Sequence, residues 1–245
     1  MNLYYLNKKP IFTEPELGLM ELNSFLSHVN DPIFEMKAVF TVESITISGK
    51  FENAIAVDAF CIGNTNAYKY KLETAEGIFE GYIKTRQDEI EGYTRGLITI
   101  HDLDDVIFID SFKLTLDGEE SLFLGHLFFG QKVVLPRFKV EPQRGTAFFN
   151  EASRSFGGQS YGMKRTTLDS FAVKYQRITY DERQIITEYM EKVQNTVPHI
   201  IDPYSEARDF FPPMYVTLNI GESQMTKLNE DGFFYSGSLA WKEAK

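Results

Sequence analysis

Short apolar–polar alternations recur through the first 140 residues, and turn-forming residues separate them. Strands spaced by about 8 to 12 residues with turns between them are typical of β-sandwiches and barrels. A parallel sheet would need a crossover, usually helical, between strands, and no helical crossover between the expected strands appears before residue 180. The sequence therefore predicts a mainly β, antiparallel sandwich and excludes doubly wound α/β folds. Beyond a run at 42–47, the expected strands are 54–62, 68–72, 77–84, 94–100, 106–109, 111–116, 122–129 and 132–138.

The run Ala54–Ile62 is almost entirely apolar, as expected of a central strand covered on both faces. It contains Cys61, the only cysteine, so an intrachain disulfide and a thiolate-rich zinc site are excluded. We interpret Cys61 as a small buried hydrophobe. Tight hairpin turns are predicted at Asp117-Gly118 and at Gly130-Gln131.

One helix is predicted from Asp181 to Val197. Thr179 and Glu182 have the spacing of a capping box, and Pro198 cannot continue a helix. An apolar face is expected from residues at three- and four-residue spacing, namely Ile185, Ile186, Tyr189, Met190, Val193 and Val197. A strand at 167–178, with Phe171, Val173 and Tyr175 on one face, precedes the helix, and strands are expected after it at 199–202, 214–220 and 232–241.

Residues 139–162 are polar, glycine-containing and basic, with a turn expected at Gly157–Ser160. We interpret this stretch either as a solvated linker or as a basic interface for an acidic neighbour. Three parts are predicted: a lead-in or arm at 1–37 with a short helix at 17–28, a jelly-roll-like sandwich at 38–140, and an α+β sandwich at 141–245. The basic residues of the connection are Arg137, Lys139, Arg144, Arg154, Lys164 and Arg165.

No catalytic, cofactor-binding or metal-binding residue is assigned. The four histidines lack the spacings of known metal sites, and no phosphate-binding or nucleophile motif occurs. The acidic run Asp102–Asp110 is interpreted as a charged strand edge, with a nonstandard cation site left open. A net charge of −10 argues against nucleic acid or an anionic membrane as partner. No stretch has the length of a signal peptide's apolar region or of a membrane span, so we expect cytoplasmic synthesis.

Residues 44–138, with the stretch Ala56–Asn66, resemble the galactose-binding-like jelly rolls of tailed-phage structural proteins. The runs Leu122–Gln131 and Leu135–Phe138 belong to the same likeness. Residues 157–245 resemble the sandwich-plus-helix of tail-tube and distal-tail proteins, through the strand at 167–178, the helix, the proline-bounded loop and the closing strand Gly237–Glu243. In distal-tail proteins the tube-like domain usually comes first, so the domain order differs.

The resemblance implies a non-enzymatic virion component of a phage tail tip or baseplate, with no cofactor. Its expected partners are further copies in a ring and neighbouring tail proteins, and a ring would close the edges of its sheets. The first alternative is a carbohydrate-binding module for host recognition, in which Tyr68, Tyr70, Phe79 and Tyr82 stack on sugars. A hydrolase with paired carboxylates is the second alternative.

Overall fold

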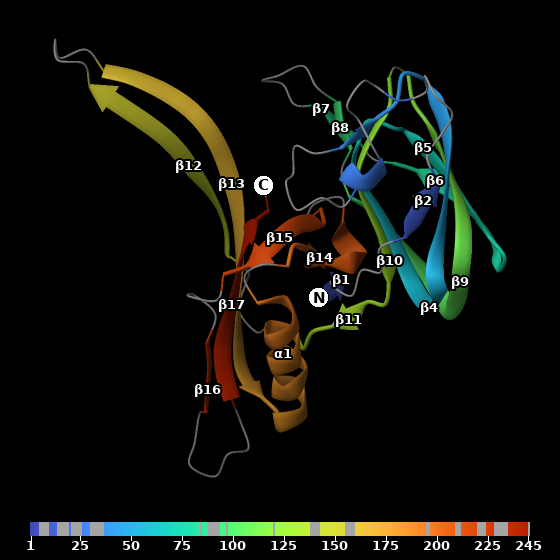
Figure 1. The fold of residues 1–245 in the computed structure, drawn as a ribbon. Coiled ribbons are helices and arrows are strands. Elements are labelled where there is room, and N and C mark those ends of the chain that lie inside the picture. Colours follow the sequence, from blue (N-terminus) through green and yellow to red (C-terminus); the bar gives the residue numbers. More distant parts are fainter. Residues whose placement is uncertain are drawn as a thin grey trace. The chain divides into compact units, whose positions relative to one another are not determined.

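Figure 1 shows the computed structural model of the 245-residue chain. The structure describes residues 1–4, 10–13, 20, 26–29, 37–83, 85–87, 94–96, 98–119, 121–137, 143–154, 160–194, 197–208, 212–219, 224–227 and 235–244. The described residues are mainly β-strand, with antiparallel sheets and one α-helix, which confirms the predicted fold class.

The chain forms two compact units. The sandwich unit comprises residues 2–134, 200–214 and 245, and the hairpin unit comprises Met1 and residues 135–199 and 215–244. Each unit is described by itself below.

The largest sheet of the sandwich unit has the strand order β3-β10-β4-β9-β5-β6, with β2 also paired to β4. A separate pair is formed by β7 and β8, and β1 pairs with both β11 and β14. The elements are β1 (Asn2–Tyr4), β2 (Ile11–Thr13), η1 (Leu26–His28), β3 (Ala38–Val39), β4 (Ser44–Thr65), β5 (Lys69–Thr74), β6 (Gly77–Tyr82), β7 (Thr85–Gln87), β8 (Thr94–Gly96), β9 (Thr99–Asp117), β10 (Phe123–Gly130), β11 (Val133–Val134), β14 (His199–Asp202) and η2 (Ser205–Ala207).

The long strands β4 and β9 organise this unit. They pair along most of their length, and the register shifts after Lys50 and after Val57. Such irregularities bend a strand and increase its twist, which lets one sheet fold over its own core. The first half of β4 alternates exposed and buried side chains, whereas its second half is paired on both edges and buried almost throughout. The predicted central strand is thus confirmed from Val57 to Ile62, whereas Ala54 at its start is exposed.

Phenylalanine side chains fill much of the core of the sandwich unit. The rings of Phe112 and Phe129 have centroids 4.6 Å apart, and Phe51 packs edge-on to Phe129 at 5.5 Å. Gly49 lies directly over this cluster, because a Cβ atom there would come within 2.5 Å of the Phe112 ring. The close approach of strand and ring therefore requires glycine at this position.

In the hairpin unit β13 pairs with β12 and β17, and β17 also pairs with β15 and β16. Figure 1 shows β12 and β13 running out well beyond β15 and β17, with α1 alongside the other end of β13. The elements are β12 (Gln143–Arg154), β13 (Ser160–Ile178), α1 (Tyr180–Val193), β15 (Met214–Leu218), β16 (Gln224–Lys227) and β17 (Tyr235–Glu243).

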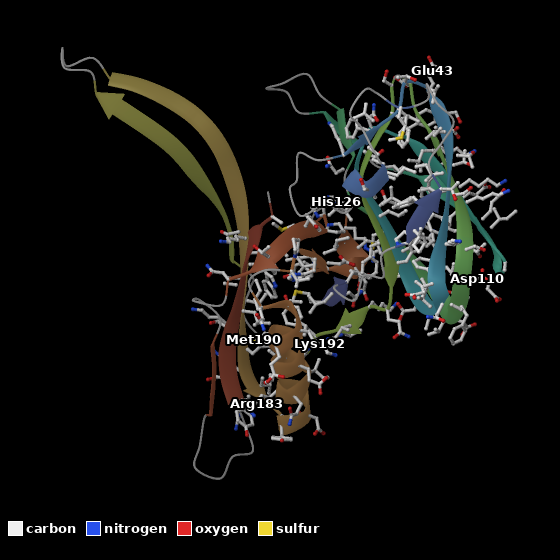
Figure 2. The ribbon with its side chains drawn as sticks, in the orientation of Figure 1. Glu43, Asp110, His126, Arg183, Met190 and Lys192 are labelled. Carbon is white, nitrogen blue, oxygen red and sulfur yellow. The ribbon has the colours of Figure 1, made fainter. Side chains whose placement is uncertain are left out.

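The helix α1 begins as predicted. The Thr179 hydroxyl accepts the Glu182 N–H at 3.3 Å, and the Glu182 carboxylate accepts the Thr179 N–H at 2.7 Å. Two orphan backbone donors are thereby satisfied, as a capping box requires. Arg183 in the first turn lies over the ring of Tyr235, and Figure 2 shows it at the opposite end of the helix from Met190 and Lys192.

The predicted end of the helix and part of its apolar face are wrong. The helix ends at Val193, because Gln194 adopts a positive φ of 48° and its N–H bonds to the Met190 carbonyl. Buried side chains come only from Ile186, Tyr189 and Val193, at spacings of three and four residues. Ile185 and Val197 are about two-fifths exposed, because they lie outside this stripe.

The basic connection is also not a loop where the structure describes it. Residues 143–154 form β12, and β13 begins at Ser160, so the strand predicted at 167–178 is seven residues longer. The alternation of Phe171, Val173 and Tyr175 into the core is confirmed, and the later strands occur as β14, β15 and β17. Residues 155–159, which include the predicted turn at Gly157, lie outside the described residues.

Neither predicted tight hairpin forms. Asp117 ends β9 and Gly118 follows it, but the next strand, β10, pairs with β4 and β3 and not with β9, so the chain crosses over at this point. After Gly130 the chain enters β11, which pairs with β1. The strands predicted at 106–109 and 111–116 are one strand, β9. Of the predicted helix at 17–28, the structure describes the short 3-10 turn η1 and the isolated residue Met20.

Candidate functional site

An ionic cluster around Arg208 joins polar side chains from several parts of the sandwich unit. Arg208 follows η2 and donates to the Asp202 Oδ2 atom from Nε at 3.0 Å and from Nη2 at 2.7 Å. The same Nη2 lies 2.7 Å from Asp102 Oδ2 on β9. Tyr4 and Lys132 complete the cluster at Asp102 Oδ1, at 3.2 Å and 3.4 Å. Five separate segments thus converge on one guanidinium group and two carboxylates.

The two carboxylates of this cluster have opposite pKa shifts. Desolvation raises the pKa of Asp202, and the hydrogen bonds and charge of Arg208 offset this only in part. Desolvation also acts on Asp102, but there Arg208 and Lys132 outweigh it and hold the pKa below its usual range. The pKa of Arg208 is raised, because its hydrogen bonds to the two carboxylates outweigh desolvation.

Two carboxylates with opposite pKa shifts can indicate an acid–base pair. Here, however, both carboxylates bind the same arginine and act as a clamp that holds segments of the chain together. The Asp202 side chain is completely buried, so it presents no oxygen to a bound substrate. Both carboxylates share the guanidinium group of Arg208, which binds carboxylates with several donors in a fixed plane. The arrangement therefore fixes the segment after η2 to β9 and β14.

Cys61 lies within the same region and is buried, which confirms its interpretation as a small core residue. Desolvation raises the pKa of the Cys61 thiol well above its usual range, and the nearby Asp102 carboxylate adds to the shift. A thiol of this kind is a poor nucleophile, because the thiolate is the reactive form.

The described histidines occupy separate places. His101 stacks on Phe60 with ring centroids 4.7 Å apart, and its Nδ1 lies 2.8 Å from the Tyr70 hydroxyl. His126 is buried in the sandwich unit (Figure 2), where desolvation lowers its pKa to about 4. His199 is buried in the hairpin unit, with a pKa likewise lowered to about 4 by desolvation. No cluster of three or more potential metal ligands occurs among the described residues.

A buried hydrogen-bond chain joins the helix to the sheet of the hairpin unit. The Trp241 Nε1–H donates to the Tyr189 hydroxyl at 2.6 Å, and the Tyr189 hydroxyl lies 2.6 Å from His199 Nε2. His199 Nδ1 faces the Val197 carbonyl at 2.9 Å. A carbonyl can only accept, so Nδ1 carries the proton and Nε2 accepts from Tyr189. The chain satisfies polar groups in the core and leaves none of them available to a ligand.

The aromatics predicted to stack on sugars do not form a common platform. Tyr70 is buried at 3% exposure, and Phe79 packs against Phe60 in the core. Tyr82 is 75% exposed on the edge strand β6, opposite Lys69. Tyr68 is 43% exposed, but it lies in the bend before β5 and not on a strand of the sheet. Tyr82 is therefore the member of this set that is available on the outer face of the sheet.

A groove of about 450 Å³ lies over the outer face of β4, β9 and β5, next to β2. Its central row is formed by the register partners Thr13, Ser48, Lys113 and Glu73, one from each strand. Lys50 and its register partner Ser111 line the next row. Sequence reasoning missed this groove, because only the register brings these four strands together.

Of the acidic run, Asp104, Asp105 and Asp110 are exposed, and Asp110 accepts the Ser111 hydroxyl at 2.8 Å (Figure 2). Cation binding at this run stays a prediction.

Of the basic connection, Lys139 lies outside the described residues, Arg137 is exposed, and Arg144, Arg154, Lys164 and Arg165 lie on β12 and β13. No helix among the described residues is long and apolar enough to cross a membrane.

No family model matches the chain, and a search of curated proteins finds no match. Solved structures give distant likenesses. A carbohydrate-binding module (CBM32-1) from a family 31 glycoside hydrolase of Clostridium perfringens has 9% identity and a TM-score of 0.37, covering 52% of this chain and 99% of that one. A second module, CpGH89CBM32-4 from the same organism, has 10% identity and a TM-score of 0.34 over 52% of this chain and 100% of that one. Reduced XRCC1, in a structure with the DNA polymerase β catalytic domain, has 10% identity and a TM-score of 0.34 over 49% of this chain and 99% of that one. None of these three structures concerns a phage tail.

Proposed function

We propose that the chain is a non-catalytic assembly subunit of a phage tail tip or baseplate, and that the β12–β13 hairpin joins it to further copies or to neighbouring tail proteins. The supporting observation is how this hairpin is paired. β13 pairs with β17 only from Ser170 onward, whereas the register of β12 with β13 continues out to Arg154 and Ser160. Among the described strands, the outer part of the hairpin therefore has two unpaired edges.

Such a hairpin needs a partner for physical reasons. A lone two-stranded ribbon is marginally stable in water, and unpaired strand edges readily pair with another chain. The composition of the hairpin suits an acidic partner, since residues 143–169 carry four Lys and Arg against two Asp and Glu in a chain whose net charge is −10. Charge complementarity of this kind steers association and fixes its register.

The proposal is tested by shortening the hairpin. Ala147 and Leu168 are register partners, so residues 148–167 can be replaced by an Asn-Gly turn that closes a two-residue hairpin. We expect the full chain to form discrete oligomers in analytical ultracentrifugation and to be present in purified phage particles. The shortened chain should stay monomeric while its thermal unfolding midpoint is retained. A full chain that is monomeric at high concentration and absent from particles would overturn the proposal.

The sandwich unit supports a second candidate, which is recognition of a host-surface glycan. The observation behind it is Tyr82, whose ring is 75% exposed beside Lys69 on the outer face of the sheet. A ring held in this way offers an apolar surface on which a sugar can stack, with polar groups beside it for the hydroxyls.

A glycan array with the full chain tests this candidate. We expect binding to a defined group of glycans that is lost in Tyr82→Ala and kept in Tyr180→Ala, which removes a tyrosine that is 51% exposed on α1. The loss expected for one stacked aromatic is about 1 kcal/mol or more, which corresponds to a Kd that is weaker by roughly fivefold or more. Equal binding by both variants would count against the glycan candidate.

A further inference from the structure

The groove over β4, β9 and β5 is locally cationic in an acidic chain. Lys50 and Lys113 lie on its floor and are diagonal neighbours, because Lys50 is opposite Ser111 and Lys113 is opposite Ser48. Such neighbours lie about 7–8 Å apart on a sheet surface. Their ammonium groups are like charges on the same face of the sheet, so an anion that lies between them is attracted by both.

The nearby carboxylate does not neutralise this pair. Glu73 is opposite Lys113 in the register, but its oxygen forms an ion pair with Lys71 at 2.5 Å. That hydrogen bond and charge hold the pKa of Glu73 below its usual range, with a smaller effect from Lys113. Among the described residues, no carboxylate forms an ion pair with Lys50 or Lys113. Both ammonium groups can therefore bind an anionic group.

The rest of the groove offers hydroxyl groups. Ser48, Ser111 and Thr13 line it beside the two lysines. Hydroxyls both donate and accept hydrogen bonds, so they suit a ligand that itself carries hydroxyls. The volume of about 450 Å³ lies within the usual range of ligand sites.

We propose that this groove binds the acidic units of an anionic glycan, with Lys50 and Lys113 binding the carboxylates of uronic acid units. The inference rests on the glycan candidate above and adds the class of sugar and its place on the sheet. Tyr82 lies on the same face, four residues along β6 from Ile78, which is opposite Glu73. A chain that stacks on Tyr82 and reaches Lys113 must therefore extend about 13 Å along the strands, which requires an oligosaccharide and not a single sugar.

Calorimetric titration of the full chain with oligogalacturonate tests the inference, with the methyl-esterified oligomer as a neutral ligand of the same sugar. We expect the uronate to bind and to weaken with added salt, and the ester to bind at least about tenfold more weakly. The double variant Lys50→Gln/Lys113→Gln should bind the uronate at least about tenfold more weakly than the parent protein does. Lys192→Gln removes an exposed lysine from α1 and should leave binding unchanged. Unchanged thermal midpoints would show that both variants remain folded.

The possible outcomes separate this inference from the glycan candidate. If the double variant binds the uronate as tightly as the parent protein does, the groove is not the binding site. A further outcome is that the neutral ester binds in a way that depends on Tyr82 but not on the two lysines. That result supports the glycan candidate and contradicts the inference that the sugar is acidic. Equally tight binding of poly-glutamate overturns the sugar class, since any polyanion would then suffice. Absence of uronate binding overturns the inference, while the array result for Tyr82→Ala decides the glycan candidate.

Discussion

Replacing Arg208 with alanine should lower the free energy of unfolding by about 3–5 kcal/mol at neutral pH, because it leaves a buried carboxylate without its partner. Asp202 is fully buried, and its Oδ2 atom accepts two hydrogen bonds from Arg208. Its second oxygen, Oδ1, is buried and has no hydrogen-bond partner among the described residues. Without Arg208 the buried carboxylate of Asp202 loses the cation that donates both of its hydrogen bonds. Urea unfolding of the full chain measures the loss.

The loss should become smaller in acid. The pKa of Asp202 is already raised in the folded protein, and removing the cation raises it further. A folded-state pKa above the unfolded value means that the folded variant binds more protons, so its stability rises as the pH falls through that raised pKa. The difference between Arg208→Ala and the parent protein should therefore narrow between neutral pH and the ordinary pKa of an aspartate.

Two further variants isolate the cause. Lys132→Ala removes the other cation of the cluster, which forms a longer, partly exposed pair with Asp102 at 3.4 Å. Pairs of this kind contribute about 0–1 kcal/mol. We therefore expect a small loss that stays nearly constant from neutral pH down to the ordinary pKa of an aspartate, because the pKa of Asp102 lies below that range. Adding Asp202→Asn to Arg208→Ala should recover part of the lost stability, since the buried charge is removed. If Arg208→Ala lowers the free energy of unfolding by no more than Lys132→Ala does, the ion pairs of Arg208 do not stabilise the fold.

Local patterns predicted the elements that one segment of sequence determines by itself. The capping box at Thr179 and the apolar run at 54–62 both depend on neighbours within a few residues, and both were confirmed. The outer part of the β12–β13 hairpin was missed, because it lacks the apolar–polar alternation of a strand with one buried face. Its glycines and arginines instead have the composition of a loop.

The sites depend on contacts that no local pattern contains. Arg208 and Asp102 are 106 residues apart, and Arg208 lies in a stretch bounded by prolines that gave no sign of a buried ion pair. Likewise, the groove needs the register of β2, β4, β9 and β5 to bring Lys50 near Lys113. The charge on Asp102 was visible in the sequence, but its role as the second carboxylate for Arg208 follows only from the fold.

Replacing Tyr189 with phenylalanine should lower the free energy of unfolding by about 2–4 kcal/mol, although the ring and its packing are retained. The hydroxyl accepts from Trp241 Nε1 and donates to His199 Nε2, both at 2.6 Å. Its loss leaves one buried donor and one buried acceptor unsatisfied, and each costs about 1–3 kcal/mol. Urea unfolding followed by the fluorescence of Trp241, the only tryptophan, reports on this unit directly.

Tyr180→Phe is the matched control for that experiment. Tyr180 lies on the same helix, but it is 51% exposed, and its hydroxyl accepts from Gln184 Nε2 at 2.6 Å at the surface. Water can replace that bond, so we expect a loss below about 0.5 kcal/mol. Equal losses for the two variants would mean that the buried chain from Trp241 to His199 contributes nothing beyond packing. A large loss for Tyr189→Phe alone would identify these hydrogen bonds as the link that holds α1 to the sheet.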